Sequence, residues 1–401
     1  MFCAMANNVK RIDRSHDLEF GIVLGVTSIM FLIKMCFSFC VFGTNDITSW
    51  YLYAGLIEKV GTFKIYSVIG LYNHPPLISW ILKLIICLEH TTHLSFPYLF
   101  RVLPIVADFF SVIVIWALLE KYDAKNKAVI CVICALNPIN FLISGFHGNT
   151  DPIFILFILF SLLLIEENKI VPAGLIYGLS LCIKIVPLIL IPMFFFSLRS
   201  KQKIVLFFFS SLLIPLITYT PYLIYDYHSV VRNIFSYNSY PAWGLGHLLD
   251  SVSKNLNINI LVRHISDGIL QKYTAGFRVI FFVAQIVLLR GLTKTGKFDL
   301  MKLSFLSISL FLILTPGFGV QYLSWLSYFA IAVFPIIGSI YVLLGGITLW
   351  RIYLSWGGGL PPYYANSWTS GLWMGDFSLL VLWLLIIIML IKLMVDHKEC
   401  S

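Results

Sequence analysis

Carboxylate side chains follow apolar runs at two places in the chain, and both could take part in proton transfer. Asp46 comes directly after the apolar run 20–42, which is long enough to cross a bilayer. Asp151 lies near the end of a second polar run, 145–152, which also contains His147. A carboxylate at the end of a membrane span can remove a proton from a hydroxyl group at the surface. The apolar part of the same substrate would stay in the lipid.

If the apolar runs cross the membrane in alternating directions, a group of polar side chains falls on one face, the non-cytoplasmic one. They are Asp46, His74, His147, Asp151, Lys184, Asp226, His228 and Arg232. Two carboxylates with imidazole and cationic donors suit the transfer of a group from an anionic phosphate leaving group. One carboxylate would accept the proton of the attacking hydroxyl, and the cations would stabilise the departing phosphate. We therefore predict a group transfer at the membrane surface with Asp46 as the general base.

The composition is that of a polytopic membrane protein. Of 401 residues, 59% are hydrophobic and only 12% are charged, and the mean hydropathy is +0.90. Soluble domains carry about 25% charged residues. We predict an all-α bundle of about 12 transmembrane helices. No second soluble domain is evident, so we divide the chain into a cytoplasmic segment 1–19, a catalytic module 20–340, and C-terminal spans with the tail, 341–401.

Basic residues lie in short clusters between the apolar runs, which is the pattern expected of cytoplasmic loops. The clusters are Lys10, Arg11 and Arg14; Lys121, Lys125 and Lys127; Arg199, Lys201 and Lys203; and Arg290, Lys294 and Lys297. The net charge of +9 therefore reflects membrane topology, and we predict no nucleic-acid partner. The cysteines show no metal-binding spacing.

Three segments have specific expected structures. Residues 47–60 mix apolar and polar side chains, which predicts an amphipathic helix in the membrane interface. The span 96–119 carries Arg101 and Asp108, which share one helix face. Because an uncompensated charge in a span is costly, we predict that Asp108 either faces a wet cavity or forms a buried structural pair with Arg101 or another helix. The segment 225–273 is the longest polar stretch, and its aromatic content argues against disorder.

The same residues also have purely structural interpretations. Asp46 could be the cap of a helix, and Lys184 could extend to the membrane interface. His147 and Asp151 are four residues apart, which allows metal binding on a helix, but the neighbouring glycine and proline do not suit that geometry. Lys34, inside the first span, has no partner that the sequence identifies, and we assign it a structural role.

Short motifs follow one another in a characteristic order. They are Tyr72-x-x-Pro75-Pro76-Leu77, Arg101-x6-Asp108, Leu136-Asn137-Pro138, Ile143-Ser144, Gly148-Asn149-Thr150-Asp151, Tyr177-Gly178, Lys184-Ile185-x-Pro187 and Gln321-Tyr322-Leu323-x-Trp325. This series resembles the C superfamily of membrane glycosyltransferases (GT-C), which use polyprenyl-phosphate sugars. Within it, the series is most similar to the first mannosyltransferase of glycosylphosphatidylinositol (GPI) synthesis and to bacterial polyprenol-phosphate-mannose enzymes. The resemblance covers residues 20–340.

The resemblance implies roles for individual residues. Asp46 occupies the position of the catalytic aspartate in the first outer loop, and Asp151 that of the acidic residue in the second. Lys184, Gln321 and Tyr322 are implied to lie near the donor phosphate or sugar. The donor-binding set that we predict is completed by His74, His147, Asn149 and Arg232.

The chain departs from the family pattern at positions that bear on metal binding and on the identity of the transferred sugar. The mannosyltransferase relatives carry Asp-x-Asp in the first loop, where this chain has Thr44-Asn45-Asp46. An amide is a poorer ligand than a carboxylate for Mg²⁺ or Mn²⁺, so no cofactor or metal is firmly predicted. The His-Glu-Lys element of the related glucosyltransferases is missing, and mannose is the favoured sugar.

We therefore predict a multi-pass glycosyltransferase that moves a hexose from a polyprenyl phosphate to an acceptor hydroxyl with inversion. Its expected partners are the lipid-linked donor, a lipid, glycan or protein acceptor, and membrane lipids. The expected location is the plasma membrane of a prokaryote or the ER membrane of a eukaryote, with the site on the periplasmic or lumenal face. The alternatives are a transporter or flippase of lipid-linked saccharides, which usually shows repeated halves, and a non-catalytic membrane subunit.

Overall fold

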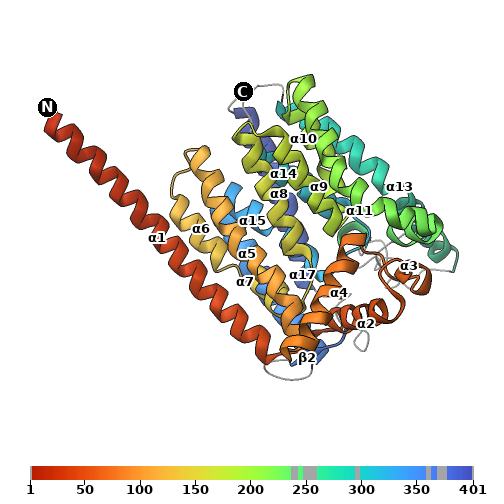
Figure 1. Ribbon diagram of the computed structural model, residues 1–401. Helices are drawn as coiled ribbons and strands as arrows, with labels where there is room; N and C mark the ends of the chain where they lie inside the picture. Colours follow the sequence, from red (N-terminus) through yellow and green to blue (C-terminus); the bar gives the residue numbers. More distant parts are fainter. Residues whose placement is uncertain are drawn as a thin grey trace.

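The computed structural model is almost entirely helical and describes residues 2–235, 243–246, 260–293, 299–357, 363–367 and 377–399 (Figure 1). The α-helices with assigned labels are α1 (Phe2–Cys40), α2 (Asn45–Val60), α3 (Ile65–Val68), α4 (Pro76–Thr92), α5 (Phe96–Lys121), α6 (Lys127–Ala135), α7 (Pro138–Leu142), α8 (Asp151–Glu166), α9 (Ile170–Ile183), α10 (Ile191–Ser197), α11 (Lys201–Phe235), α13 (Ile260–Thr293), α14 (Leu300–Leu314), α15 (Leu323–Val333), α16 (Pro335–Gly357) and α17 (Phe377–Glu399). Shorter elements are the π-helical turn η1 (Ile143–His147), the 3-10 turns η2 (Val186–Leu190) and η3 (Val320–Tyr322), and the strands β1 (Gly43–Thr44) and β2 (Tyr364–Ala365).

Among the described residues, seven helices are long and apolar enough to cross a membrane. They are His16–Cys40, Phe96–Lys121, Lys127–His147, Lys201–Phe235, Gln271–Thr293, Pro335–Gly357 and Phe377–His397. Shorter apolar helices cover Ile170–Ile183, Val186–Ser197, Leu300–Leu314 and Val320–Val333. The predicted polytopic helical bundle is confirmed. Roughly 12 crossings were expected from apolar length. Several of these predicted crossings coincide with the shorter helices.

The predicted crossing 128–144 is built from three helical pieces. The Asn137 side chain caps α7 by accepting hydrogen bonds from two of its N–H groups, at 3.0 and 3.4 Å. Pro138 is the first residue of α7, where a missing N–H breaks no helical hydrogen bond. The turn η1 then ends at Gly148, whose φ of +74° suits a residue without a side chain. This ending places His147 at the point where the span meets the second polar run.

The helices run further than predicted at two places. The helix α1 begins at Phe2, so it continues through the predicted cytoplasmic segment 1–19. The helix α11 continues to Phe235 and α13 begins at Ile260, so both ends of the predicted polar segment 225–273 are helical. A polar composition does not distinguish a loop from a helix with a solvent-facing side. Parts of this segment lie outside the described residues (236–242 and 247–259).

Asp108 forms a buried pair with another helix, which is one of the two pairings predicted for it. Arg101 does not pair with Asp108; instead, the Lys34 ammonium of α1 lies 2.7 Å from Oδ2 of Asp108. The Tyr328 hydroxyl donates to Oδ1 of Asp108 at 3.1 Å. The Arg101 guanidinium donates to main-chain carbonyls, which are those of Ser38, Val41, Pro97 and Phe146. Carbonyls at helix ends lack intrahelical partners, and a guanidinium with five donors can satisfy several of them.

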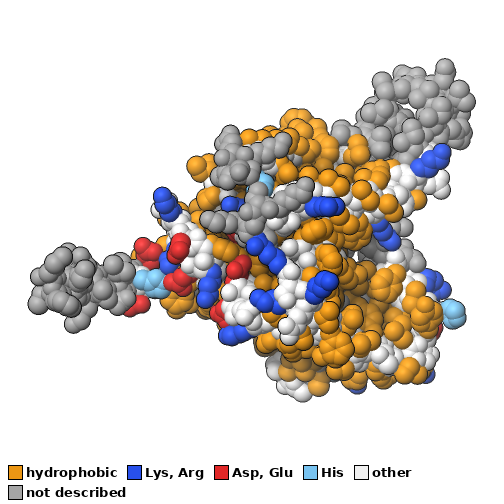
Figure 2. Space-filling model, turned by 90° about the horizontal axis from the view of Figure 1, so that it is seen from above, with side chains coloured by type: hydrophobic (Ala, Val, Ile, Leu, Met, Phe, Trp, Pro, Cys, Tyr) orange, Lys and Arg blue, Asp and Glu red, His pale blue; other side chains and the backbone are white. Residues whose placement is uncertain are grey.

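The bundle has two distinct ends. In the view of Figure 1, α2, α4 and β2 lie at the lower end and both chain termini lie at the upper end. The strand β1 pairs in parallel with β2, which joins the start of α2 to a segment near the C-terminus. Seen from above, the upper end carries many lysine and arginine side chains among apolar ones (Figure 2). The basic face and the polar residues around α2 therefore lie at opposite ends of the bundle.

Candidate active site

Asp46 lies in the first turn of α2, and a cap ties this turn to η1. The Thr44 hydroxyl accepts a hydrogen bond from the Asp46 N–H at 3.3 Å and donates one to the His147 carbonyl at 2.9 Å. A carboxylate near a helix N-terminus is also stabilised by the helix dipole. The predicted role of Asp46 in helix capping is thus carried by Thr44 instead, which leaves the aspartate side chain available.

The Asp46 carboxylate is anchored through one of its oxygens. Its Oδ2 accepts hydrogen bonds from Nε2 of His147 at 2.9 Å and from Nδ2 of Asn149 at 3.0 Å. No described residue donates to Oδ1, and the side chain is 32% exposed. Burial raises the pKa of Asp46, but the interaction with His147, the hydrogen bond from Asn149 and the charge of Lys184 bring it below its ordinary value. The carboxylate is therefore ionised at neutral pH, and its free oxygen can accept a proton.

Two glycines allow the segments that carry these residues to approach each other. Gly43 and Gly148 have φ values of +110° and +74°. A Cβ at Gly148 would lie 2.2 Å from Cδ1 of Ile47, and one at Gly43 would lie 2.6 Å from the Phe146 carbonyl oxygen. Any side chain at either position would push β1 and α2 away from the end of η1, and so separate Asp46 from its partners.

Asp151 is the first residue of α8 and is fully buried. Its Oδ1 pairs with the Lys184 ammonium, and its Oδ2 accepts from the Trp325 indole N–H at 2.7 Å. The ammonium also lies 5.7 Å from the centroid of the Tyr322 ring and 5.5 Å from that of Trp325. Because both carboxylate oxygens are occupied, this geometry favours a role for Asp151 in holding Lys184 over a role as a base.

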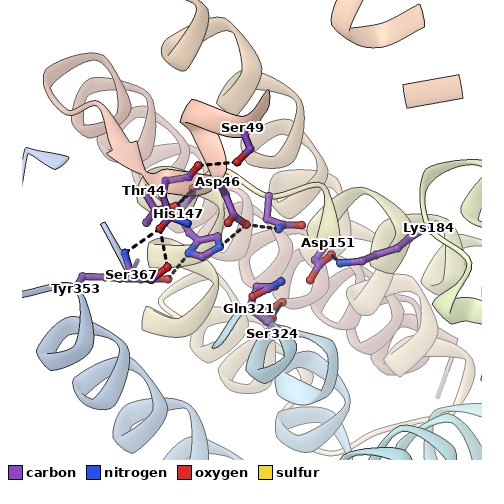
Figure 3. A network of polar contacts seen from close by, with 12 residues as sticks. Thr44, Asp46, Ser49, His147, Asp151, Lys184, Gln321, Ser324, Tyr353 and Ser367 are labelled. Atoms are coloured by element: carbon purple, nitrogen blue, oxygen red, sulfur yellow. Dashed lines mark hydrogen bonds and ion pairs between the residues drawn. The ribbon is translucent and has the colours of Figure 1, made fainter. Parts of the chain in front are cut away.

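The Asp46 cluster (Asp46, His147 and Asn149) and the Asp151 cluster (Asp151, Lys184 and Trp325) lie close together in the structure (Figure 3). Asn149 contacts Asp46 and precedes Asp151 by two residues. The Cα atoms of Asn149 and Asp151 are therefore at most about 7.6 Å apart. The charge of Lys184 also acts on Asp46. The two outer-loop aspartates therefore share one site, as the alternating topology requires.

His74 lies among aromatic side chains beside this site. Its ring centroid is 4.1 Å from that of Trp50 and 5.6 Å from that of Tyr72. Burial and the positive charge of Lys184 lower the pKa of His74 to about 3, although Asp46 acts in the opposite direction. The imidazole is neutral at physiological pH, so His74 can donate a hydrogen bond to a ligand but adds no positive charge.

Gln321 and Tyr322 lie in η3, where the motif places them next to Trp325. The Tyr322 ring stacks on the Trp325 ring with centroids 3.9 Å apart. The Gln321 side chain lies against Gly319, where a Cβ would be 2.6 Å from its Oε1. In Figure 3 Gln321 lies near both clusters, with Ser324 beside it.

The structure does not bring Arg232 into this network. It is exposed in the last turn of α11, and its Nε donates to the amide oxygen of Asn233 at 3.3 Å. Asn233 in turn donates to the carbonyls of Tyr66 and Ile69, at 3.0 and 2.9 Å, which fixes the end of α11 against α3. Arg232 makes no described hydrogen bond to the Asp46 or Asp151 clusters.

Three residues that the sequence did not identify as functional complete the network. The Tyr353 hydroxyl lies 3.0 Å from Nδ1 of His147. The Asn45 amide oxygen accepts from the N–H and hydroxyl of Ser367 at 3.0 and 2.9 Å. Trp325, which holds the second aspartate, belongs to a quoted motif. The contact between Tyr353 and His147 spans 206 positions of the chain, and the contact between Ser367 and Asn45 spans 322 positions. No sequence pattern signals either of them.

The described residues contain no site with three protein ligands for a divalent metal ion. In the part of the chain that the structure describes, no three His, Cys, Asp or Glu side chains converge on a point that could hold a metal. The Asn45 oxygen accepts from Ser367 and so is not a free ligand beside Asp46.

Buried polar atoms near the site lack hydrogen-bond partners among the described residues. They are Oδ1 of Asn149, Oγ1 of Thr150, Nε1 of Trp50 and the hydroxyl of Tyr72. Buried polar atoms are normally paired, so these four atoms mark unused hydrogen-bonding capacity around the site. The arrangement as a whole places a carboxylate with a free oxygen close to a cation.

Comparison with known proteins gives two matches. The family model of glycosyltransferase family 87 matches residues 72–316, which is more than half of the chain. GPI mannosyltransferase 1 of Saccharomyces cerevisiae is 29% identical over 134 residues, a match that covers 33% of this chain and 32% of the yeast protein. The family match contains Asp151 and Lys184, but it begins after Asp46 and ends before Gln321.

The family match agrees with the ordered motifs and with the apolar helices of the bundle. The predicted relationship to GT-C enzymes is thereby confirmed at the level of the family. The chain is a polytopic helical membrane protein and belongs to glycosyltransferase family 87, a family of the GT-C type.

Proposed function

We propose that the protein transfers a hexose from a polyprenyl phosphate to a hydroxyl group of an acceptor, with inversion at the anomeric carbon. The observation that carries the proposal is the Asp46 carboxylate, which is anchored through Oδ2, free at Oδ1, and close to the Lys184–Asp151 pair. Mannose is the favoured hexose because the yeast relative is named a mannosyltransferase. The acceptor is a lipid, a glycan or a protein.

In the proposed reaction Asp46 is the general base. Its Oδ1 takes the proton of the acceptor hydroxyl while the hydroxyl oxygen attacks the anomeric carbon. The bond from that carbon to the phosphate oxygen breaks, and its electron pair leaves with the polyprenyl phosphate. A single displacement of this kind inverts the anomeric configuration. His147 and Asn149 hold Oδ2, so that the free oxygen keeps its orientation.

Lys184 stabilises the negative charge that develops on the leaving phosphate. An ammonium group has three donors, and Asp151 uses one of them in this structure. The remaining donors can reach phosphate oxygens, since the Lys184 side chain is 16% exposed. His74, which is neutral, contributes a further donor without adding charge. Asp151 and Trp325 hold the cation in place through the contacts described above.

Apolar side chains lie beside the proposed phosphate site. They include Phe154, Ile158, Val186, Pro187, Leu190, Trp325 and Phe329, which line a small hollow about the size of a water molecule. Phe154 and Pro187 each follow a member of the Asp151–Lys184 pair by three residues. In the proposed complex the phosphate lies on Lys184 and the polyprenyl chain leaves along the apolar outer surface of the bundle.

We further propose that the site faces the periplasm or the lumen. Basic residues favour the cytoplasmic side of a membrane, and the basic face in Figure 2 lies at the opposite end from α2. The membrane is the plasma membrane in a prokaryote and the ER membrane in a eukaryote.

The experiment is transfer by the purified protein in lipid nanodiscs with a panel of polyprenyl phosphates that carry different hexoses. Release of polyprenyl phosphate is measured, and the anomeric configuration of the product is read by NMR. We expect release with one donor, loss of release in Asp46→Asn, and retention in Asp226→Asn. Asp226 is a suitable control because its carboxylate accepts from the Ser229 N–H in α11, outside the site. A transporter or a non-catalytic subunit would release no polyprenyl phosphate with any donor.

A further inference from the structure

His147 is held between two groups, one at each ring nitrogen. Its Nε2 lies 2.9 Å from Oδ2 of Asp46, and its Nδ1 lies 3.0 Å from the Tyr353 hydroxyl. The three side chains form a continuous chain of hydrogen bonds from the partly exposed carboxylate to a buried tyrosine near the end of α16 (Figure 3). The His147 side chain is 4% exposed, and Tyr353 is fully buried.

The chemistry of the two partners determines which nitrogen of His147 carries its proton. An ionised carboxylate can only accept hydrogen bonds, so Nε2 must carry a proton to bond to Asp46. The Tyr353 hydroxyl proton has no acceptor among the described residues other than Nδ1 of His147. If Nδ1 also carried a proton, the hydroxyl would be a buried donor without an acceptor, which is costly. Both partners therefore favour the neutral imidazole protonated at Nε2.

The Tyr353 ring is itself held firmly. It lies on α16, which packs against α7, and its ring centroid is 5.1 Å from that of Phe146 and 5.7 Å from that of Trp356. Because Phe146 precedes His147 in the chain, the same turn η1 presents both rings to α16. The tyrosine thus has one orientation in which its hydroxyl faces the imidazole.

Tyr353 comes from a part of the chain that follows the family match, which ends at residue 316. The same C-terminal part supplies β2, which pairs with β1, and Ser367, which bonds to Asn45. All three contacts act on the segment that carries or supports Asp46. The position of this carboxylate is thus set from both ends of the chain.

We propose that Tyr353 is a positioning residue, which acts through His147 to hold the Asp46 carboxylate in its reactive orientation. The inference rests on the proposed function of Asp46 as the base. Tyr353 touches neither substrate nor reacting atoms; it keeps Nδ1 unprotonated and fixes the ring orientation of the histidine, much as the third member of a catalytic triad orients its histidine. Without it, Asp46 still selects the proton on Nε2, but Nδ1 is free to take a second proton and the ring loses one of its two anchors.

The kinetic test compares Tyr353→Phe with Tyr341→Phe. Tyr341 is a matched control because it lies on the same helix, is fully buried, and donates its hydroxyl hydrogen bond to the Leu323 carbonyl at 3.0 Å. We expect kcat of Tyr353→Phe to fall about tenfold, near the upper limit for one neutral hydrogen bond, with KM for the donor unchanged within about twofold. We expect Tyr341→Phe to keep the wild-type kcat per folded molecule. Equal losses of kcat in the two variants would overturn the proposal.

A second readout does not require activity. Histidine labelled with ¹⁵N reports the protonated nitrogen of each ring, and the signals of His147 are those that His147→Gln removes. We expect the neutral, Nε2-protonated ring in the wild type and in Tyr341→Phe, and a larger fraction of the doubly protonated ring in Tyr353→Phe at the same pH. An unchanged protonation of His147 in Tyr353→Phe would overturn the proposal.

The two readouts separate this proposal from the proposed function. A wild-type protein that releases no polyprenyl phosphate, but whose protonation at Nδ1 of His147 depends on Tyr353, would refute the function and support the positioning of His147. A protein that transfers sugar, but whose protonation at Nδ1 is independent of Tyr353, would support the function and refute the positioning.

Discussion

Replacing Lys34 by methionine should destabilise the bundle by about 3–5 kcal/mol, which is the usual cost of leaving one member of a buried ion pair without its partner. The Lys34 ammonium lies 2.7 Å from Oδ2 of Asp108, and their side chains are 6% and 3% exposed. Methionine has a similar length and no charge, so the change removes the charge and little volume. Asp108 would keep the Tyr328 hydroxyl as a donor but would lose its counter-charge.

The magnitude follows from two opposing terms. At this distance the attraction between the two charges is about 6 kcal/mol for an effective dielectric constant of about 20. Most of this is offset in the wild type by the cost of removing both groups from water. In Lys34→Met the attraction is lost, but the desolvation cost of the Asp108 carboxylate remains. The double variant Lys34→Met/Asp108→Asn removes both charges, and we expect it to lie within about 1–2 kcal/mol of the wild type.

The assay is reversible unfolding in mixed micelles, with the double-mutant cycle used to isolate the coupling between the two side chains. The same cycle with Arg101→Met and Asp108→Asn serves as the control. We expect strong coupling for Lys34 with Asp108 and additive effects for Arg101 with Asp108, since Arg101 bonds only to main-chain carbonyls among the described residues. Additive effects for Lys34 with Asp108 would refute the assignment of this pair.

Three further predictions concern the active-site end. Gly148→Ala should lower stability by about 1–3 kcal/mol in the same unfolding assay, because its φ is positive and a Cβ would collide with Ile47; unchanged stability would contradict this. Because the pKa of Asp46 lies below its ordinary value, the base stays ionised as pH falls, and the acidic limb of kcat/KM should lie below about pH 4; a limb near pH 6 would argue against Asp46. Ser367→Ala removes one of two hydrogen bonds to Asn45, so stability should fall by about 1 kcal/mol with no change in donor KM, and a changed KM would place Ser367 in contact with the donor.

Local features of the site were predictable from the sequence. Hydropathy alone indicates a helical membrane protein, and the positions of Asp46 and Asp151 after apolar runs place both carboxylates at one end of the bundle. The mixed pattern of residues 47–60 predicts a helix, and the structure confirms one over Asn45–Val60. These features depend on residues close together in the chain, for which pattern and periodicity carry information.

Contacts between distant residues were not predictable. The spacing of Arg101 and Asp108 suggested a pair on one helix face, but Lys34 on α1 provides the counter-charge instead. The sequence offers no reason to match Lys34 with a residue 74 positions away, because many helix arrangements would bury either one. The same holds for Tyr353, whose contact with His147 depends on how α16 packs against η1 and α7.

The central claim is that Asp46 is the base, and single-turnover transfer by Asp46→Asn measures this most directly. Asparagine keeps the shape of the side chain and the oxygen that accepts from His147, so donor affinity and folding should match the wild type. General-base catalysis contributes about 10²- to 10⁴-fold, and we expect the transfer rate to fall by that factor. A rate within twofold of the wild type, with the donor bound normally, would contradict the account.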